Sequence, residues 1–152
     1  MNVLKRLAEL NIELPPPPRP AATYVTVRRE GNLVYVSGQG PMVGAEPTVT
    51  GKVGAEVTEE QAYDAARLAV LNGLAAIHHA VGLDKIQRMV RLTGWVSSAN
   101  DFHRQHVVVD GASDLLIKIF GDNGQHTRCA LGVNVLPFNI PVEIELTAVA
   151  AE

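Results

Sequence analysis

Two apolar patterns alternate along this chain, one with the spacing of an α-helix and one with the spacing of a β-strand. Helical spacing is clearest over residues 58–82, where an apolar stripe follows the capping-box sequence Thr58-Glu59-Glu60-Gln61 and Gly82 supplies a stop signal. Shorter helical patterns cover residues 2–11 and 111–120. The sequence therefore predicts three helices, and the first is too short to be stable unless it docks on the rest of the protein.

Strand patterns fill most of the remaining chain. The runs with strand character are residues 24–28, 33–37, 86–98, 128–136 and 142–150. Glu30-Gly31-Asn32 separates the first two runs and predicts a hairpin turn. Residues 86–98 carry apolar side chains for both faces, which is typical of a strand covered on each side. Residues 43–57 are mixed and predict a loop with at most a short strand.

The predicted order after the N-terminal helix is β-β-α-β-α-β-β, which indicates an α+β fold with helices on one face of the sheet. The proline-rich stretch 15–20 predicts an extended polyproline II spacer, because proline fixes the backbone dihedral and lacks an amide donor. Such a stretch could also be a ligand for an aromatic-lined peptide-binding module. We expect residues 1–20 to form a helix and spacer, and residues 21–152 to form the main domain.

Composition narrows the class of protein. The chain has 152 residues, of which 47% are hydrophobic and 19% charged, so one folded domain with a full core is expected. The net charge of −3 is scattered and no basic run occurs, which argues against nucleic acid and anionic lipid as partners. No apolar stretch is long enough to span a membrane, and the N-terminus is typical of an amphipathic helix rather than a signal peptide. With one cysteine, Cys129, these features favour a cytoplasmic protein.

Several common catalytic arrangements are excluded by spacing. The histidines lack carboxylate or cysteine partners at the separations of a zinc site, so we expect no metal. Ser37-Gly38-Gln39 lacks the preceding glycine of a hydrolase nucleophile elbow. Cys129 has no histidine at a diagnostic spacing and is more typical of a small packing residue.

Two acidic positions and one basic position remain as candidates for chemistry. Arg128 opens a strand that otherwise carries no charge, so its guanidinium needs an internal carboxylate, a subunit contact or an anionic ligand. Glu143 and Glu145 share one face of the last strand. A structural ion pair on a solvated edge explains these residues as well as a functional site does.

A series of short motifs runs from Tyr24 to the C-terminus. They are Tyr24, Gly31-Asn32, Val36-Ser37-Gly38-Gln39, Asn72, Gly82-Leu83, Asp101-Phe102, Arg128, Leu136-Pro137 and Val142-Glu143-Ile144-Glu145. In this order and spacing, the chain resembles the RidA (YjgF-like) family, also described as endoribonuclease L-PSP. The N-terminal helix, the spacer and residues 111–116 look like a longer subgroup of that family.

This resemblance implies a chorismate-mutase-like α+β fold, with a mixed β-sheet, two main helices on one face and the extra N-terminal helix. It also implies a homotrimer with sites at the subunit interfaces. The implied activity is hydrolysis of reactive enamines and imines, such as 2-aminoacrylate and 2-iminobutyrate, to 2-keto acids and ammonia. The resemblance implies no metal and no organic cofactor.

The resemblance also assigns roles to residues of this chain. Arg128 looks like the arginine that binds the substrate carboxylate, and Glu143 looks like the acid that holds the attacking water. Tyr24 and Ser37-Gly38 would line the pocket from the same or the neighbouring subunit. The backbone of Ala130 would help to place the water and the imine. A guanidinium can bind a carboxylate with two parallel hydrogen bonds, and a nearby glutamate can pass protons, so this set suffices chemically.

Three positions depart from the family pattern. Ala130 stands where many members have cysteine, and Cys129 lies one place earlier. The family asparagine after Asp101-Phe102 aligns with His106 or, after a small shift, with Asp110. Ala22-Thr23 replaces a Gly-Pro ahead of the tyrosine.

Two other functions stay open from the sequence. The same clefts could bind a carboxylate metabolite or a partner protein without catalysis, for which Arg128 alone would be enough. Ribonuclease activity follows only from the older family description, and the acidic chain lacks a basic aromatic platform for RNA.

Overall fold

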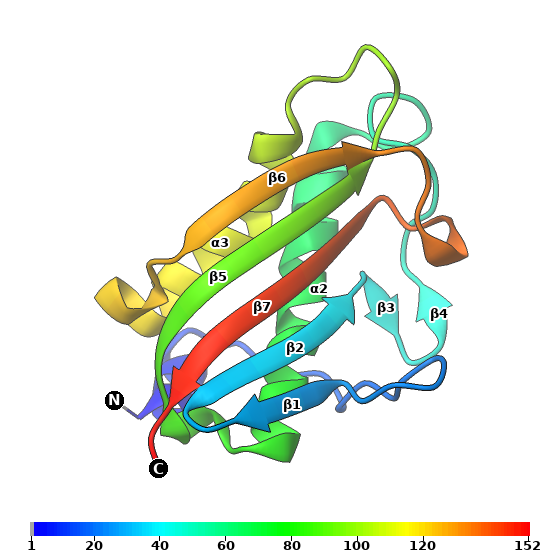
Figure 1. Ribbon diagram of the computed structural model, residues 1–152. Helices are drawn as coiled ribbons and strands as arrows, with labels where there is room; N and C mark the ends of the chain where they lie inside the picture. The colour runs from blue at the N-terminus through cyan, green and yellow to red at the C-terminus, as the bar shows by residue number, and fades with distance from the viewer. Residues whose placement is uncertain (1) are drawn as a thin grey trace.

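A computed structural model describes residues 2–152 of the protein (Figure 1). Its main sheet consists, in spatial order, of β1 (Val27–Glu30), β2 (Leu33–Gln39), β7 (Val142–Ala150), β5 (Ile86–Ser97) and β6 (Thr127–Val133). Only β5 and β6 run parallel, so the sheet is mixed. The two-residue strands β3 (Met42–Val43) and β4 (Glu46–Pro47) form a separate small ribbon.

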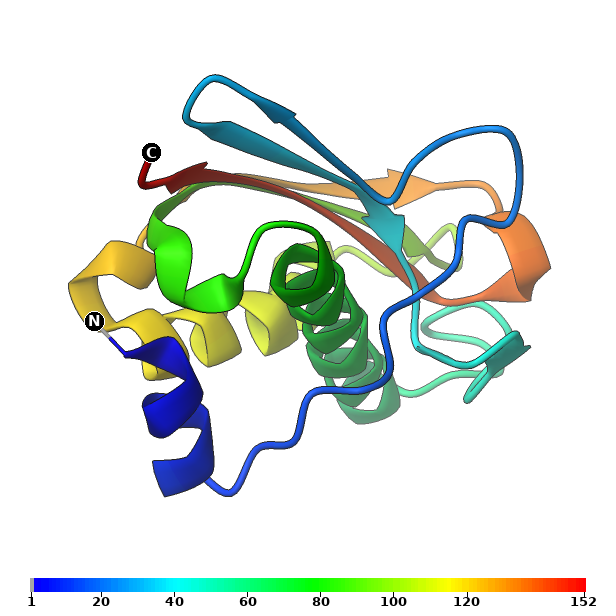
Figure 2. The same ribbon diagram turned by 90° about the horizontal axis from the view of Figure 1, so that it is seen from below.

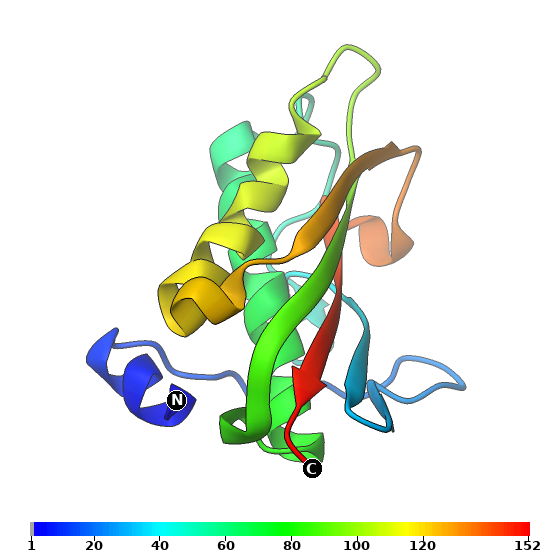
Figure 3. The ribbon, with the colours of Figure 1, turned by 60° about the vertical axis from the view of Figure 1, so that its left-hand side comes forward.

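The two long helices, α2 (Glu59–Ala80) and α3 (Gln105–Phe120), cover one face of the sheet (Figures 2 and 3). The capping box at the start of α2 is confirmed: Thr58 Oγ1 accepts from the Gln61 amide at 3.1 Å, and Gln61 Oε1 accepts from the Thr58 amide at 2.9 Å. Within residues 2–152, short 3₁₀ turns connect elements at η1 (Leu83–Lys85), η2 (Gly121–Gly124) and η3 (Pro137–Asn139). The α+β fold with two main helices on one face is therefore confirmed.

The hydrophobic core lies between the helices and the sheet. The alanine stripe of α2 is buried and brings this helix close to β7 and β2. At the crossing of α2 and α3, a Cβ atom on Gly111 would meet the Tyr63 carbonyl group, so only glycine permits this approach. Leu116 and Phe120 of α3 fill the centre of the core, where each is at most 1% exposed.

The predicted N-terminal helix is present as α1 (Val3–Glu9). Its Val3 and Leu7 are buried in the same core as the rest of the chain, and Asp84 accepts hydrogen bonds from the Val3 and Leu4 amides. This is how a seven-residue helix becomes stable. The proline-rich stretch has no regular structure and runs from α1 across the helix side of the protein towards β1 (Figure 2).

Two element boundaries differ from the expectation. Helix α3 begins at Gln105, six residues before the predicted start, because Val108 and Val109 are buried in the core although three consecutive valines favour a strand. Strand β1 begins at Val27 rather than at Tyr24, and residues 24–26 lie outside its pairing register. Both differences are tertiary effects, which local patterns do not report.

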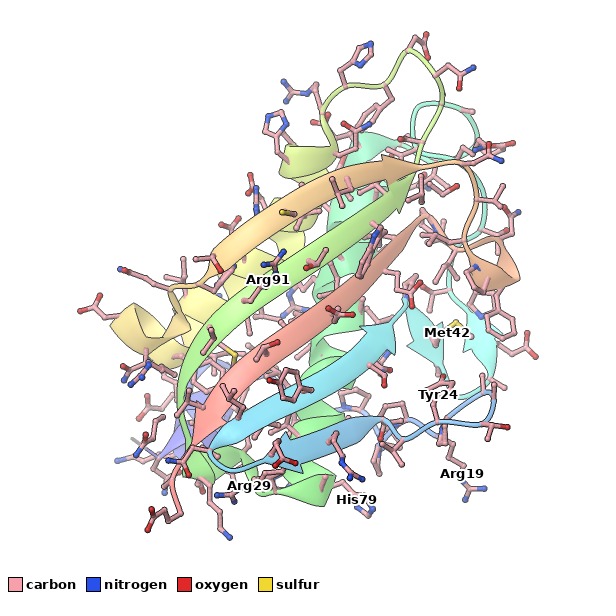
Figure 4. All side chains as sticks on the ribbon, in the orientation of Figure 1. Arg19, Tyr24, Arg29, Met42, His79 and Arg91 are labelled. Atoms are coloured by element: carbon pink, nitrogen blue, oxygen red, sulfur yellow. The ribbon has the colours of Figure 1, made fainter. Side chains whose placement is uncertain are left out.

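The second face of the sheet is uncovered in a single chain, and Figure 4 labels Arg91 on it. We expected β5 to be covered on both faces, but the helices cover only one. Large apolar side chains are consequently exposed: Tyr35 and Leu131 are each 45% accessible. Strand β6 forms one edge of the sheet. Among residues 2–152, no helix combines the length and the apolar character needed to cross a lipid bilayer.

Candidate functional site

A β-bulge shapes the sheet where Ser37 and Gly38 lie. Val36 pairs with Leu146 and Gln39 pairs with Ile144, so two residues of β2 oppose the single residue Glu145 of β7. Bulges re-aim side chains and are frequent beside functional sites. Here the bulge turns Ser37 towards the preceding segment and leaves space above Gly38.

Glu143 fills that space from β7. A Cβ atom on Gly38 would collide with the Glu143 carboxyl group, so the absence of a side chain on Gly38 makes room for the acid. Glu143 lies opposite Trp95 of β5 and belongs to the uncovered face, because its neighbours Val142 and Ile144 are buried under the helices. Burial raises the pKa of Glu143, and the nearby charge of Glu145 raises it further. The carboxyl group therefore holds a proton more readily than an ordinary glutamate.

Tyr24 belongs to the segment that Ser37 holds against the bulge. The Ser37 hydroxyl donates to the Val25 carbonyl at 2.7 Å, and the Ser37 amide donates to the Thr26 carbonyl at 2.9 Å. The Tyr24 hydroxyl accepts from the Ala21 amide at 3.1 Å, and the side chain is largely exposed. Figure 4 labels Tyr24 in this segment, at the β1 side of the sheet. Three of the predicted pocket residues are thus linked to one feature, the bulge.

Arg128 lies near the start of β6 and faces α3. Its Nη1 donates to Asp110 Oδ1 at 2.7 Å and to Ser113 Oγ at 3.1 Å, and its Nη2 donates to the His106 carbonyl at 3.2 Å. The side chain is 24% accessible and that of Asp110 is 43% accessible, so this ion pair sits at the edge of the protein. Among residues 2–152, no group accepts from Nε or from the second hydrogen of Nη2. Two N–H groups of the guanidinium therefore have no acceptor among the described residues.

Ala130 lies two residues after Arg128 and shares its side of the strand. It packs against the core and pairs with Gly94, whose Cα lies close to the Val109 side chain of α3. The intervening Cys129 is exposed on the opposite side, where its sulfur lies 3.9 Å from Arg91 Nη2. Arg128 and Ala130 thus form a second group of predicted residues.

The register places Arg128 and Glu143 on opposite faces of the sheet. Arg128 pairs with Leu92 and Leu92 pairs with Leu146, and both leucines are buried under the helices. Glu143 lies an odd number of residues from Leu146, so it points to the other face. Strand β5 also separates the strands of the two residues by roughly 10 Å. A single chain therefore holds the candidate residues in two separate groups, one with Arg128 and Ala130 and one with Glu143, Gly38, Ser37 and Tyr24.

Sequence patterns do not indicate the side chains that hold Arg128. Asp110 is expected only as one possible position of the family asparagine, and no pattern points to Ser113 as a partner of the arginine. Asp110 and Ser113 are three residues apart, the spacing at which helical side chains share a face, so a helix predicted from Gln105 would have indicated them. No cluster of three or more metal-ligating side chains occurs in the described part of the chain.

Comparison with known proteins agrees with this architecture. Residues 5–149 match the family described as "YjgF/chorismate_mutase-like, putative endoribonuclease". Protein TCP17 of Trypanosoma cruzi is 39% identical over 146 residues, which is 95% of this chain and 91% of that protein.

Solved structures show the same likeness. Atu1372 of Agrobacterium tumefaciens, a protein with unknown function, is 41% identical with a TM-score of 0.89, and the match covers 98% of this chain and 92% of that one. TdcF of E. coli with bound serine is 25% identical with a TM-score of 0.64, and the match covers 89% and 94% of the two chains. The expected fold and family are confirmed: this chain belongs to the YjgF (RidA-like) family.

Proposed function

We propose that this protein hydrolyses small 2-imino acids, of the 2-aminoacrylate and 2-iminobutyrate type, to 2-keto acids and ammonia. The observation that carries the proposal is the environment of Glu143, a half-buried carboxyl group with a raised pKa beside a bulge that makes room for it. Such a group suits a reaction in which one proton leaves a water molecule and another reaches a departing amine.

Arg128 supplies the second requirement, which is recognition of the substrate carboxylate. Its two available N–H groups can donate to one carboxylate, and this fixes the neighbouring imine carbon relative to the protein. TdcF, the relative whose structure holds serine, gives a precedent in the family for a small amino acid as ligand.

The chemistry needs no group beyond these residues and water. Water adds to the carbon of the protonated imine while Glu143 accepts one proton of the water, which gives a neutral carbinolamine. Glu143 returns this proton to the nitrogen and then accepts the hydroxyl proton of the carbinolamine, as the C–N bond breaks and the C=O bond forms. The departing ammonia takes that last proton from Glu143 and leaves as ammonium. An enamine substrate first takes a proton on carbon to become the imine. Because protonated imines already react with water, positioning and one acid–base group can supply the acceleration.

We infer that the complete site forms between two copies of this chain in a homotrimer. Arg128 and Glu143 point away from opposite faces of one sheet, so one chain cannot direct both at one substrate. The exposed Tyr35 and Leu131, together with the edge strand β6, favour contact with another copy. In this arrangement Arg128 and Ala130 of one protomer meet Glu143 and the bulge of its neighbour.

The remaining pocket residues receive supporting roles in this proposal. Tyr24 and the Ser37-Gly38 bulge would form the wall on the Glu143 side, and the Ala130 backbone would orient water or the imine on the Arg128 side. We also infer that the protein works in the cytoplasm, since its one cysteine, Cys129, is free and exposed.

The alternative is a non-catalytic trimer that binds a carboxylate metabolite or a partner protein. Ammonia release from 2-iminobutyrate generated in situ separates the two functions. Catalysis predicts a rate well above background that falls about 100-fold in Glu143→Gln, the range of a lost acid–base group. No rate above background, together with calorimetric binding of 2-ketobutyrate, would establish the binding protein instead. RNA cleavage that disappears in the same variant would support the nuclease.

A further inference from the structure

Arg128 is the first member of a series of hydrogen bonds that continues through Ser113 and His126 to Gly124. Arg128 Nη1 donates to Ser113 Oγ at 3.1 Å, and Ser113 Oγ lies 2.9 Å from His126 Nε2. His126 Nδ1 lies 2.6 Å from the Gly124 carbonyl oxygen. Ser113 is only 8% exposed, so it acts on Arg128 rather than on a ligand.

The carbonyl group at the end of this hydrogen-bond series determines which atom donates in each bond. A carbonyl oxygen can only accept, so His126 Nδ1 carries the hydrogen and the neutral ring presents Nε2 as an acceptor. The Ser113 hydroxyl then donates to Nε2, which leaves its oxygen lone pairs for Arg128. The side-chain polar groups of Ser113 and His126 thus each have a partner of the correct kind, and satisfied hydrogen-bond networks are rigid.

Gly124, the last member of the hydrogen-bond series, is held in place by packing. A Cβ atom on Gly124 would collide with the Leu116 carbonyl group, so Gly124 lies directly against the end of α3. His126 follows in the connection from η2 to β6, two residues before Arg128. The ring therefore spans from a fixed backbone carbonyl to a serine on α3, behind the strand that carries the arginine.

Ser113 adds a third contact to the guanidinium of Arg128. The ion pair with Asp110 holds Nη1, and the His106 carbonyl accepts from Nη2. The bond to Ser113 ties Nη1 to a buried hydroxyl group on α3 as well, so all three contacts together restrict rotation of the guanidinium. Long side chains lose much conformational entropy when they bind, so an arginine that is already ordered binds a carboxylate more tightly.

We propose that Ser113 and His126 are positioning residues that hold Arg128 ready for the substrate carboxylate. This inference rests on the proposed function for its ligand class, but the geometry of the hydrogen-bond series can be tested without catalysis. Loss of either residue should weaken carboxylate binding while the reacting groups stay intact.

The functional test compares Ser113→Ala with Thr127→Ala. Thr127 likewise bears a hydroxyl that donates a hydrogen bond, in its case to Val90 O at 3.1 Å, but it does not touch the guanidinium, so it is the control. We expect Ser113→Ala to raise the KM for 2-iminobutyrate and the Kd for 2-ketobutyrate by about tenfold, with kcat within about twofold. Thr127→Ala should leave all three unchanged, and Ser113→Thr should restore much of the affinity.

Nitrogen-15 NMR of the histidine rings tests the chain independently. The proposal requires His126 in the Nδ1–H form, with an Nε2 signal that moves in Ser113→Ala and in Arg128→Lys. A ring protonated on Nε2, or a Kd for 2-ketobutyrate that Ser113→Ala leaves unchanged, would overturn it. Wild-type protein without deaminase activity would refute the proposed function alone, because calorimetry and NMR still decide the role of Ser113.

Discussion

The Glu143 carboxyl group occupies the space that a side chain on Gly38 would need. The two residues lie on neighbouring strands, and the bulge opposite Glu145 brings Gly38 beneath the acid. The colliding atoms of Glu143 belong to the end of a flexible side chain, so a larger residue at position 38 can displace the acid without breaking the sheet.

We therefore predict that Gly38→Ala lowers activity while the protein stays folded. The displaced carboxyl group can no longer hold water, and we expect kcat to fall at least about tenfold. A double-mutant cycle isolates the cause: in a Glu143→Ala background, Gly38→Ala should cost nothing further. Additive losses in ammonia release would mean that Gly38 acts by another route.

The raised pKa of Glu143 predicts a dependence of stability on pH. The folded state binds this proton more tightly than the unfolded state, so the stabilisation is fully present below the ordinary value of 4.5. It is lost as the pH rises through the higher folded pKa. Glu143→Gln should therefore gain stability relative to wild type between pH 4 and pH 7 in urea unfolding.

Glu59 provides the matched control for that measurement. A hydrogen bond from Arg104 lowers the pKa of Glu59, so its contribution appears above its ordinary pKa and is lost as the pH falls through the lowered one. Glu59→Gln should shift in the opposite direction, losing stability relative to wild type between pH 4 and pH 7. Parallel shifts in the two variants would contradict the assignment for Glu143.

Arg128→Ala should abolish recognition of the substrate carboxylate. Loss of charge-assisted hydrogen bonds worth roughly 3 kcal/mol predicts about a 100-fold fall in kcat/KM for 2-iminobutyrate. Arg104→Ala is the control, since it breaks another arginine–carboxylate pair, with Glu59, that does not involve a candidate site residue. Equal effects of the two substitutions would show that the fall in kcat/KM comes from lowered stability rather than from weaker substrate binding.

The crossing of α2 and α3 gives a prediction for the fold itself. Gly111→Ala places a methyl group against the Tyr63 backbone, which cannot move without shifting a helix, and should destabilise the protein by about 1–3 kcal/mol. Gly73→Ala is a matched change in the other helix, where the new Cβ would meet side-chain atoms and no backbone, the nearest being Leu146 Cδ1 at 3.3 Å. Its effect on the midpoint of urea unfolding should be much smaller.

Local patterns were sufficient for most of the fold. The capping box predicted the start of α2 because its hydrogen bonds are made within one helical turn. The alternation of apolar and polar residues in the last strand predicted the observed bounds of β7, since one face of this strand is buried and the other is not. The start of α3 could not be read in this way, because only its packing against the sheet overrides the strand preference of Val108 and Val109.

Less of the candidate site could be predicted from the sequence. Arg128 and Glu143 could be identified from their places in the strands and from the family resemblance, but their opposite faces follow from the pairing of β6, β5 and β7. The contacts of Arg128 with Ser113 and Asp110 depend on where α3 lies across the sheet. Long-range register of this kind is not encoded in any single segment.

The sharpest test of a shared site mixes two inactive variants. Arg128→Ala and Glu143→Gln chains are unfolded, combined in equal amounts and refolded together, and ammonia release from 2-iminobutyrate is measured. If each site takes its arginine from one protomer and its acid from the neighbour, about a quarter of the sites regain both groups. The mixture should then recover about a quarter of the wild-type activity. Activity in the mixture no greater than that of the separate variants would contradict a site built from two chains.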